Sequence, residues 1–304
     1  MSATALSALQ RWGFAIVPAV GLVELVAHVA QTRPAANEGD WAAARAWVAA
    51  SAKPEDLVAF APKWIDPVGR MRFGDDIANI EREARPDETR FPRAIEVGIR
   101  GAHLAAFDGW RKSDTQRFGG VTVTTWENPS PAHVLSDLVS MIEPRHAHVF
   151  RGDAECPWSH TRPESGGLGY GPAVPADRFA CPGGGFAGMS VVADLDYVPH
   201  RCIYAPPAGG PLRIRFEGVR FGHELHGHHA IYVEAERNRT GAPVTLSFAS
   251  GGTSIGSIVH RDGDGWKPFE LDTSQLDGQT GELTVEVSSP SSDRRQYCFE
   301  ADTR

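Results

Sequence analysis

The residues best suited to metal chemistry form a histidine-rich segment, His223–His229, with the sequence HELHGHH. It departs from the zinc motif H-E-x-x-H, because Gly227 stands where the motif places its second histidine and also disfavours a helix. On an extended chain, His226 and His228 share one face and can chelate a transition metal, with Glu224 as a nearby carboxylate. The segment therefore has two interpretations, a zinc-dependent hydrolase site and weak, adventitious metal binding.

A second group of candidate ligands is the pair Asp194 and Asp196, which follows an apolar run. Such a D-x-D pattern holds a divalent metal and a diphosphate in nucleotide-sugar glycosyltransferases. Alternation with Leu195 places both carboxylates on one face of an expected strand. No nucleotide-binding half-domain precedes the pair, so a structural acidic strand is the alternative.

The segment Asp262–Gly265, with the sequence DGDG, resembles the start of a calcium loop. Trp266 occupies the next odd ligand position, and no glutamate closes a twelve-residue frame. A tight acidic turn is therefore expected, with a single-turn calcium site as the alternative. No cofactor is predicted, and calcium or zinc at these segments are the alternatives.

Two tryptophans are candidates for stacking against a sugar ring, because sugar sites pair an aromatic face with planar hydrogen-bonding groups. Trp64 and Arg70 lie in a loop after a buried strand, where open parallel sheets bind ligands. The alternative for this loop is a structural role, with the tryptophan packed over the sheet edge. The second candidate set consists of Trp266 with Arg261, Asp262 and Asp264.

Composition excludes several classes of function. The net charge is −8, and Lys and Arg nowhere form a block, so nucleic acid is not expected as a partner. Neither G-x-G-x-x-G nor G-x-x-x-x-G-K-[ST] follows an expected strand. Abundant Arg, Ala, Gly and Pro indicate a GC-rich, bacterial genome.

The first half of the chain predicts alternating helices and strands, hence a small, mostly parallel α/β domain over residues 38–152. Asp40 is expected to cap the first of its helices. The expected helices are Trp41–Ala52, Asp75–Arg85, His103–Trp110 and Pro131–Ile142, and the expected strands are Leu57–Ala61, Ala94–Ile99, Val121–Trp126 and Ala147–Phe150.

Residues 153–189 are rich in Gly and Pro and are expected to form a linker or long loops. From residue 190 to 304 only short strands separated by turns are predicted, which favours a jelly-roll-type β-sandwich. The expected strands are Ser190–Tyr197, Arg201–Ala205, Leu212–Phe216, His229–Ala235, Val244–Ala249, Ser254–Val259, Lys267–Leu271, Leu283–Val287 and Gln296–Glu300.

All four cysteines lie in the second half of the chain, and none forms a C-x-x-C pair. Two disulfides are therefore expected if this part is exported. We predict Cys202 with Cys298, which joins the first expected strands of the sandwich to the last, and Cys156 with Cys181.

The N-terminal segment Trp12–Ala30 is largely apolar and follows Arg11. Its unbroken apolar run ends at Val23, but Glu24 and His28 lie four residues apart and can pair on one helix face. A membrane anchor within residues 1–33 is expected, with a cleaved signal peptide as the alternative. The chain is then single-pass in the cell membrane, with its soluble part extracytoplasmic, periplasmic or at the cell surface.

Two family resemblances add to this picture. The stretch Gly265–Ser289, GWKPFELDTSQLDGQTGELTVEVSS, resembles galactose-binding-like β-sandwiches of the carbohydrate-binding-module type. The anchor followed by DWAAARAWVAASAKPEDLVAFAPKW resembles the last membrane helix and soluble tail of protein-mannosyltransferase-type glycosyltransferases, which use lipid-linked sugars. This second resemblance implies a relative of their noncatalytic part.

The predicted fold class is α/β plus all-β: an N-terminal membrane helix, a small mostly parallel α/β domain and a jelly-roll-type β-sandwich. The predicted function is a membrane-anchored extracytoplasmic noncatalytic module, which recognises glycan or glycolipid or docks on a membrane glycosyltransferase in envelope assembly. The alternative is an enzyme, either a metal-dependent hydrolase or a glycosyltransferase.

Overall fold

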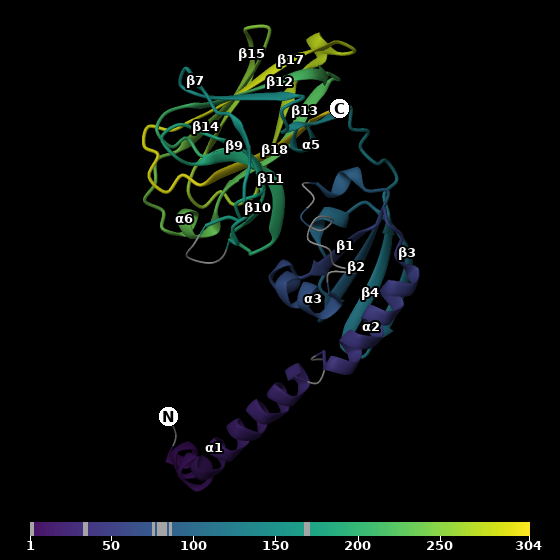
Figure 1. Ribbon diagram of the computed structural model, residues 1–304. Coiled ribbons are helices and arrows are strands. Elements are labelled where there is room, and N and C mark those ends of the chain that lie inside the picture. Colours follow the sequence, from purple (N-terminus) through teal and green to yellow (C-terminus); the bar gives the residue numbers. More distant parts are fainter. Residues whose placement is uncertain (1–2, 33–35, 75–76, 78–83, 85–86, 167–170) are drawn as a thin grey trace.

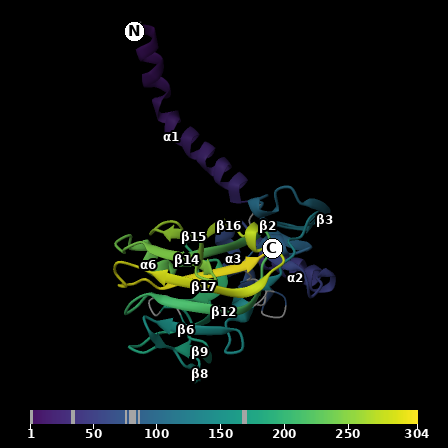
Figure 2. The same cartoon turned by 90° about the horizontal axis from the view of Figure 1, so that it is seen from above.

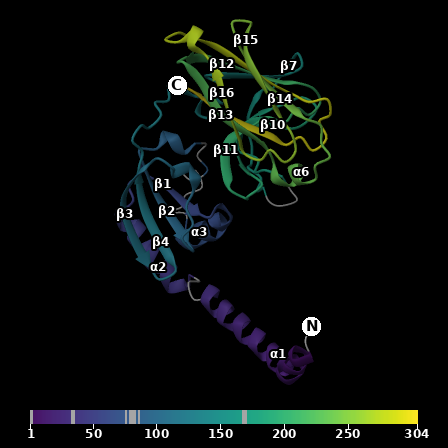
Figure 3. The same cartoon turned by 180° about the vertical axis from the view of Figure 1, so that it is seen from behind.

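The computed structural model describes residues 3–32, 36–74, 77, 84, 87–166 and 171–304. Figure 1 shows three parts along the chain: an extended N-terminal helix, a small sheet with helices, and a large body of strands. The small sheet lies beside the strand-rich body, and Figure 3 shows the same arrangement from behind.

Helix α1 (Ala3–Thr32) covers the predicted helix over residues 12–30 and projects away from the rest of the molecule (Figure 2). Among the described side chains between Phe14 and Val29, most apolar ones are exposed, with Phe14 and Val17 each 77% accessible. Among the described residues, no helix is both long enough and apolar enough to cross a membrane. This finding does not support the expected membrane span.

The small sheet has the strand order β1-β2-β4-β3, and helix α2 (Glu38–Ser51) packs against one of its faces. Its strands are β1 (Leu57–Ala61), β2 (Arg93–Ile99), β3 (Arg111–Phe118) and β4 (Val121–Glu127). Only β1 and β2 run parallel, so the prediction of a mostly parallel sheet is wrong. The parallel pair remains because a crossover separates β1 from β2, whereas β4 follows β3 through a tight turn.

Helix α2 begins with a capping box. The Asn37 side chain accepts a hydrogen bond from the Asp40 amide, and the Asp40 carboxylate accepts one from the Asn37 amide. The N-cap is thus Asn37, three residues before the predicted cap. Trp41, Ala44 and Val48 recur at helical spacing and are buried against the sheet, which confirms the predicted helix.

The other helices in the described residues of this part are short: η1 (Lys63–Ile65), α3 (Asp66–Phe73), η2 (Glu88–Arg90) and η3 (Ala105–Phe107). The expected helix His103–Trp110 is reduced to η3, and β3 was not predicted. The expected helix Asp75–Arg85 lies almost wholly outside the described residues.

The large body is a β-sandwich, as predicted, and the jelly-roll type is not confirmed. One sheet has eight strands, with the order β16-β13-β18-β11-β10-β9-β8 and β5 paired to β18; the other has the order β15-β14-β17-β12-β6-β7. The elements are β5 (Ser136–Asp137), α5 (Leu138–Met141), β6 (Ala147–Arg151), β7 (Ala154–Glu155), β8 (Trp158–His160), β9 (Asp177–Ala180), β10 (Phe186–Ala193), β11 (Pro199–Tyr204), β12 (Leu212–Arg220), β13 (Glu224–Ile231), α6 (Val233–Arg237), β14 (Val244–Ser250), β15 (Thr253–His260), β16 (Lys267–Asp272), η4 (Ser274–Leu276), β17 (Thr280–Ser288) and β18 (Tyr297–Thr303).

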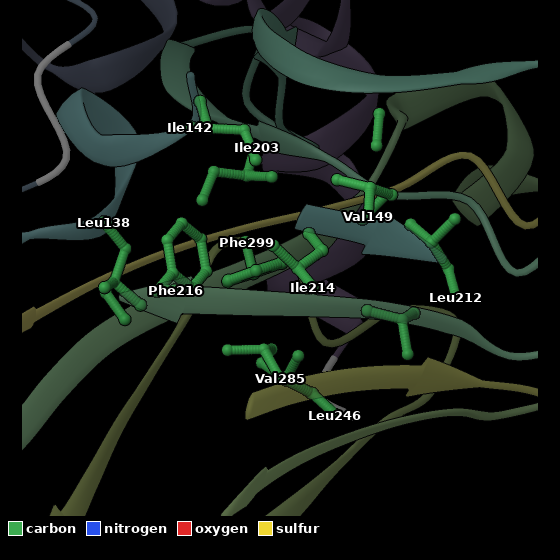
Figure 4. Close-up of a cluster of buried hydrophobic side chains, with 14 of the residues drawn as sticks. Leu138, Ile142, Val149, Ile203, Leu212, Ile214, Phe216, Leu246, Val285 and Phe299 are labelled. Atoms are coloured by element: carbon green, nitrogen blue, oxygen red, sulfur yellow. The ribbon is translucent and has the colours of Figure 1, made fainter. Parts of the chain in front are cut away.

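The sandwich core lies between the two sheets and explains the alternating pattern of the strands. Along β12, Leu212, Ile214 and Phe216 are fully buried, while the residues between them are more exposed. Figure 4 shows these side chains meeting Val149 of β6 and Phe299 of β18 in one apolar cluster.

The sandwich takes up more of the chain than the sequence pattern indicated. Strand β6, expected in the α/β domain, pairs antiparallel with β12, so that Val149 lies opposite Ile214. The Gly/Pro-rich segment 153–189 contributes β7, β8 and β9, which pair with sandwich strands. The expected helix Pro131–Ile142 is helical only at α5, because β5 takes part of it into the sheet.

Both expected disulfides are present. Cys156–Cys181 closes a segment of 25 residues, and Cys202–Cys298 connects the neighbouring strands β11 and β18 across a separation of 96. All four sulfurs belong to buried residues.

We expect the two disulfides to stabilise the fold unequally, because the entropy of the unfolded chain falls more when a longer loop is closed. Replacing both Cys202 and Cys298 with Ala should lower the free energy of unfolding by about 4–5 kcal/mol. Replacing Cys156 and Cys181 should lower it by about 3.5 kcal/mol. Chemical denaturation of the two double variants measures this order, and the reverse order would contradict the loop-entropy explanation.

Candidate functional site

The predicted acidic turn forms, and its two carboxylates already make hydrogen bonds and ion pairs with other protein groups. Asp262 accepts bonds from the Gly241 amide at 2.9 Å and from an Arg295 guanidinium nitrogen at 2.5 Å. Asp264 accepts a bond from the Lys267 ammonium at 3.0 Å. A calcium ion in this turn would have to displace these two cations, so the geometry favours an acidic turn held by internal ion pairs.

A buried polar chain lies beneath the turn and fixes its backbone. Glu236 on α6 accepts bonds from the amides of Gly263 at 3.1 Å and Gly265 at 2.7 Å, and from His260 Nε2 at 3.1 Å. His260 in turn lies 3.3 Å from His229 Nδ1, which the Tyr297 hydroxyl approaches at 2.9 Å.

This chain of carboxylate, two imidazoles and phenol has no access to a substrate, because Glu236, His229, His260 and Tyr297 are each 0% exposed. Its role is structural: burial of polar groups is tolerated where hydrogen bonds join them. Burial lowers the pKa of His229 to about 3, and electrostatic interactions with His260 and Lys267 add to the effect.

We expect this network to make the fold acid-sensitive. The His229 pKa is about 3 in the folded state against 6.5 ordinarily, so its stabilising effect is present above pH 6.5 and is lost as the pH falls towards 3. Through this group alone, the free energy of unfolding should fall by about 2.5 kcal/mol between roughly pH 6 and 4. We expect denaturation at several pH values to show that the free energy of unfolding falls less steeply with decreasing pH in His229→Gln than in the wild type.

The matched control is His133→Gln, because His133 is exposed. In this variant the free energy of unfolding should depend on pH as steeply as in the wild type. If His229→Gln also kept that pH dependence, the acid sensitivity would have another origin.

Trp266 is engaged by two imidazole rings. Its ring stacks in parallel with His200, at 4.0 Å between centroids, and with His228, at 5.4 Å. The predicted stacking of this tryptophan against a sugar would therefore compete with contacts that the protein already makes. Arg261, its predicted polar neighbour, is exposed.

The predicted D-x-D pair does not lie on one strand face. Strand β10 ends at Ala193, and Asp194 caps the following turn by accepting bonds from the amides of Asp196 at 2.9 Å and Val198 at 3.0 Å. Asp194 is buried and also accepts a bond from His200 Nε2 at 2.9 Å, whereas Asp196 is exposed. Burial by itself would raise the pKa of Asp194, but these hydrogen bonds lower it overall.

The predicted histidine ligands His226 and His228 lie side by side on β13, with ring centroids 5.3 Å apart, but their polar contacts differ. His226 lies with Glu224 and Glu270, whose ligand atoms are all within 4.8 Å of one another. Glu270, directly opposite His226 on β16, was not recognised from the sequence. One imidazole and two carboxylates form a donor set that zinc accepts. His228 instead contacts Glu300 at 2.7 Å, and burial raises the pKa of that carboxyl well above its usual range.

A second group of ligand atoms, from Asp87, His226 and Asp302, lies where the small α/β part meets the sandwich. Arg304 donates hydrogen bonds to both carboxylates, with Arg304 Nε 2.7 Å from Asp302. Arg90 approaches Asp302 as well, at 3.5 Å. The site therefore already contains internal cations, and its evident role is to join the two parts.

The other aromatic candidate, Trp64, is 60% exposed in η1. Arg70 on α3 pairs with Asp66 at 2.7 Å and lines a cavity of about 460 Å³, together with Tyr197 and Tyr232 of the sandwich. The structure thus brings Arg70 to a cavity whose aromatic residues are tyrosines from another part of the chain.

A larger cavity, which the sequence analysis missed, opens where α6 meets the loop before β18, and we call it the α6-end cleft. Its volume is about 660 Å³, within the usual size range of ligand sites. Its lining comes from separated segments: Gly171, Gly185, Phe186, Tyr204, Pro206, Ala208, Glu234, Ala235, Asn238, Ser292, Arg294, Arg295 and Gln296.

The α6-end cleft combines an aromatic pair with polar side chains. Phe186 and Tyr204 pack with centroids 4.8 Å apart, and burial raises the pKa of Tyr204 to about 12, so its hydroxyl stays neutral. Within the described part of the chain, the side chains of Glu234, Arg294 and Gln296 make no hydrogen bond or ion pair. No motif marks these residues, because tertiary folding alone assembles them.

No protein-family model and no curated protein sequence matches this chain. Among solved structures, CBM51-2 with INT domains from Clostridium perfringens ZmpB, in complex with GlcNAc, aligns at 9% identity and a TM-score of 0.31, over 68% of this chain and 40% of that one. TmCBM61 in complex with β-1,4-galactotriose aligns at 15% identity and a TM-score of 0.19, over 40% and 69%.

The arabinofuranosyltransferase AftD from mycobacteria aligns over 97% of this chain and 35% of its own, at 12% identity and a TM-score of 0.19. This chain thus spans less than half the length of the ZmpB fragment and of AftD. All three TM-scores are below 0.5, a level at which likeness establishes neither a shared fold nor a shared function.

Proposed function

We propose that this chain is a noncatalytic module that recognises glycan through the α6-end cleft. The observation that supports this most directly is the cleft's set of polar side chains without protein partners. Glu234 only accepts hydrogen bonds when ionised, Arg294 only donates them, and Gln296 does both. A sugar hydroxyl both donates and accepts, so this set matches a ligand with many hydroxyls.

The charges of the cleft also favour a neutral ligand. The carboxylate of Glu234 is balanced by the guanidinium of Arg294, and Arg295 is already paired with Asp262. Phe186 and Tyr204 supply an apolar floor rather than an open stacking face, since they are only 9% and 8% exposed. A sugar would lie with an apolar ring face over this floor and its hydroxyls towards the polar rim.

We expect a glycan array, followed by calorimetry on the full chain, to identify a neutral sugar that binds. Glu234→Ala and Gln296→Ala should each weaken binding about tenfold, because each removes a desolvated hydrogen bond worth roughly 1.5 kcal/mol. The matched control is Glu217→Ala, an exposed carboxylate on β12 outside the cleft, which should leave affinity unchanged.

The same titration with a chelator separates this proposal from the enzyme alternative. Binding or sugar hydrolysis that needs a metal and is lost in His226→Ala would move the function to Glu224, His226 and Glu270. If neither occurs and no glycan binds, docking on a membrane glycosyltransferase becomes the better hypothesis.

We further propose that the chain works outside the cytoplasm and attaches to a membrane through α1. Two disulfides support an oxidising compartment, because thiols stay reduced in the cytosol. Exposed apolar residues support the attachment, including Leu22 at 62% and Val26 at 61%, which lie one helical turn apart. Burying such side chains in lipid is favourable, at about 25 cal/mol per Å².

We expect the full chain to float with vesicles of phosphatidylethanolamine and phosphatidylglycerol. A Leu22→Asp and Val26→Asp double variant should remain in the soluble fraction, since each charge costs about 2.5–3.5 kcal/mol in lipid. The matched control is Leu22→Ile with Val26→Leu, which should float like wild type. Wild-type protein that stays soluble would refute the attachment.

A further inference from the structure

The small sheet has a second face, opposite α2, that carries a pocket of its own. The loop between β2 and β3 covers part of this face and leaves a cavity of about 300 Å³, which we call the sheet-face pocket. Its lining residues are Glu96, Gly98, Gly101, Ala102, His103, Lys112, Arg117, Thr122, Thr124 and Trp126. No residue of this pocket lines the α6-end cleft.

The carboxylate of Glu96, at the base of the pocket, is fully hydrogen-bonded to other protein groups. Glu96 is 3% exposed and accepts bonds from the Leu104 amide at 2.6 Å, from Trp126 Nε1 at 2.9 Å and from His103 Nδ1 at 3.0 Å. Both of its oxygens are therefore satisfied without a ligand, so it neither needs nor recruits a cation.

His103 lies directly beside the carboxylate of Glu96. Burial opposes protonation of this imidazole, but its bonds to Glu96 and to Asp108, at 3.2 Å, raise its pKa overall. The ring also stacks against Trp126 with centroids 4.8 Å apart, which fixes its position. His103 and Glu96 thus form a rigid floor for the pocket.

Two cations on the edge strand β3 remain uncompensated. Lys112 lies opposite Trp126 and Arg117 opposite Thr122 in the β3–β4 pairing, so both share the sheet face that bears the pocket. Within the described part of the chain, neither side chain has a hydrogen bond or an ion pair, whereas Arg111 next to Lys112 pairs with Glu127. Their positive charge is directed at a cavity that has no free carboxylate.

We propose that the sheet-face pocket binds a compact oxyanion group, a phosphate or a carboxylate, between Lys112 and Arg117. A guanidinium binds such planar or tetrahedral oxygens in a forked geometry, and an ammonium adds a point charge. The hydroxyls of Thr122 and Thr124 line the same cavity and can donate to the remaining oxygens. The volume is at the lower end for ligand sites, which selects a small group over a long chain.

The test uses calorimetry or NMR titration of the full chain at constant ionic strength. The probes are inorganic phosphate and glucuronate, with glucose as the neutral comparison. Saturable binding of at least one anion and none of glucose is expected, and the two arms show whether the source is a phosphate or a sugar acid. Lys112→Gln and Arg117→Gln should each weaken binding at least tenfold.

The matched control is Arg111→Gln, which removes the same charge from the same strand outside the pocket and should leave affinity within about twofold. Circular dichroism establishes that the variants fold, as expected for side chains on an exposed edge strand. Equal weakening in the control, or no saturable binding of either anion, would overturn the proposal. Because the sheet-face pocket and the α6-end cleft share no lining residue, failure of either proposed site leaves the other testable.

Discussion

Strand β18 imposes the constraint on which the arrangement of the molecule depends, because it buries acidic side chains that need polar partners. All seven of its residues are buried, and they include Glu300 and Asp302. A buried charge without a partner costs several kcal/mol, so the chain supplies Arg304 and Arg90 to Asp302. Arg90 belongs to η2 of the small part, and this pairing therefore also determines where that part docks.

The same strand connects the contact with the small part to the interior of the sandwich. Cys298 is bonded to Cys202 on β11, and Tyr297 ends the buried chain through His229 and His260 to Glu236. Glu236 then holds the backbone of the acidic turn. Because each polar group in this chain depends on its neighbour for a hydrogen bond, the network fixes one register of strands and loops.

The residues that match known motifs in the sequence mostly contact other protein groups. The candidate binding sites consist instead of residues that no motif marks. Asp262, Asp264 and Trp266 are engaged by Arg295, Lys267 and two imidazoles. The two cavities offer different chemistry: balanced charges suited to a neutral polyhydroxylated ligand in the α6-end cleft, and uncompensated cations suited to an oxyanion in the sheet-face pocket.

The sequence by itself determined those features that depend on local patterns. Helical spacing of Trp41, Ala44 and Val48 predicts α2, alternation along β12 predicts a half-buried strand, and the placement of four cysteines led to both disulfides. Tertiary structure decided the rest. Strand β3 reads RKSDTQRF, whose polar sequence gives no periodic signal, so it becomes a strand only by pairing with β4. Likewise Glu270 meets His226 and Arg304 meets Asp87 only through long-range pairing and docking, because their chemistry depends on contacts that no local pattern encodes.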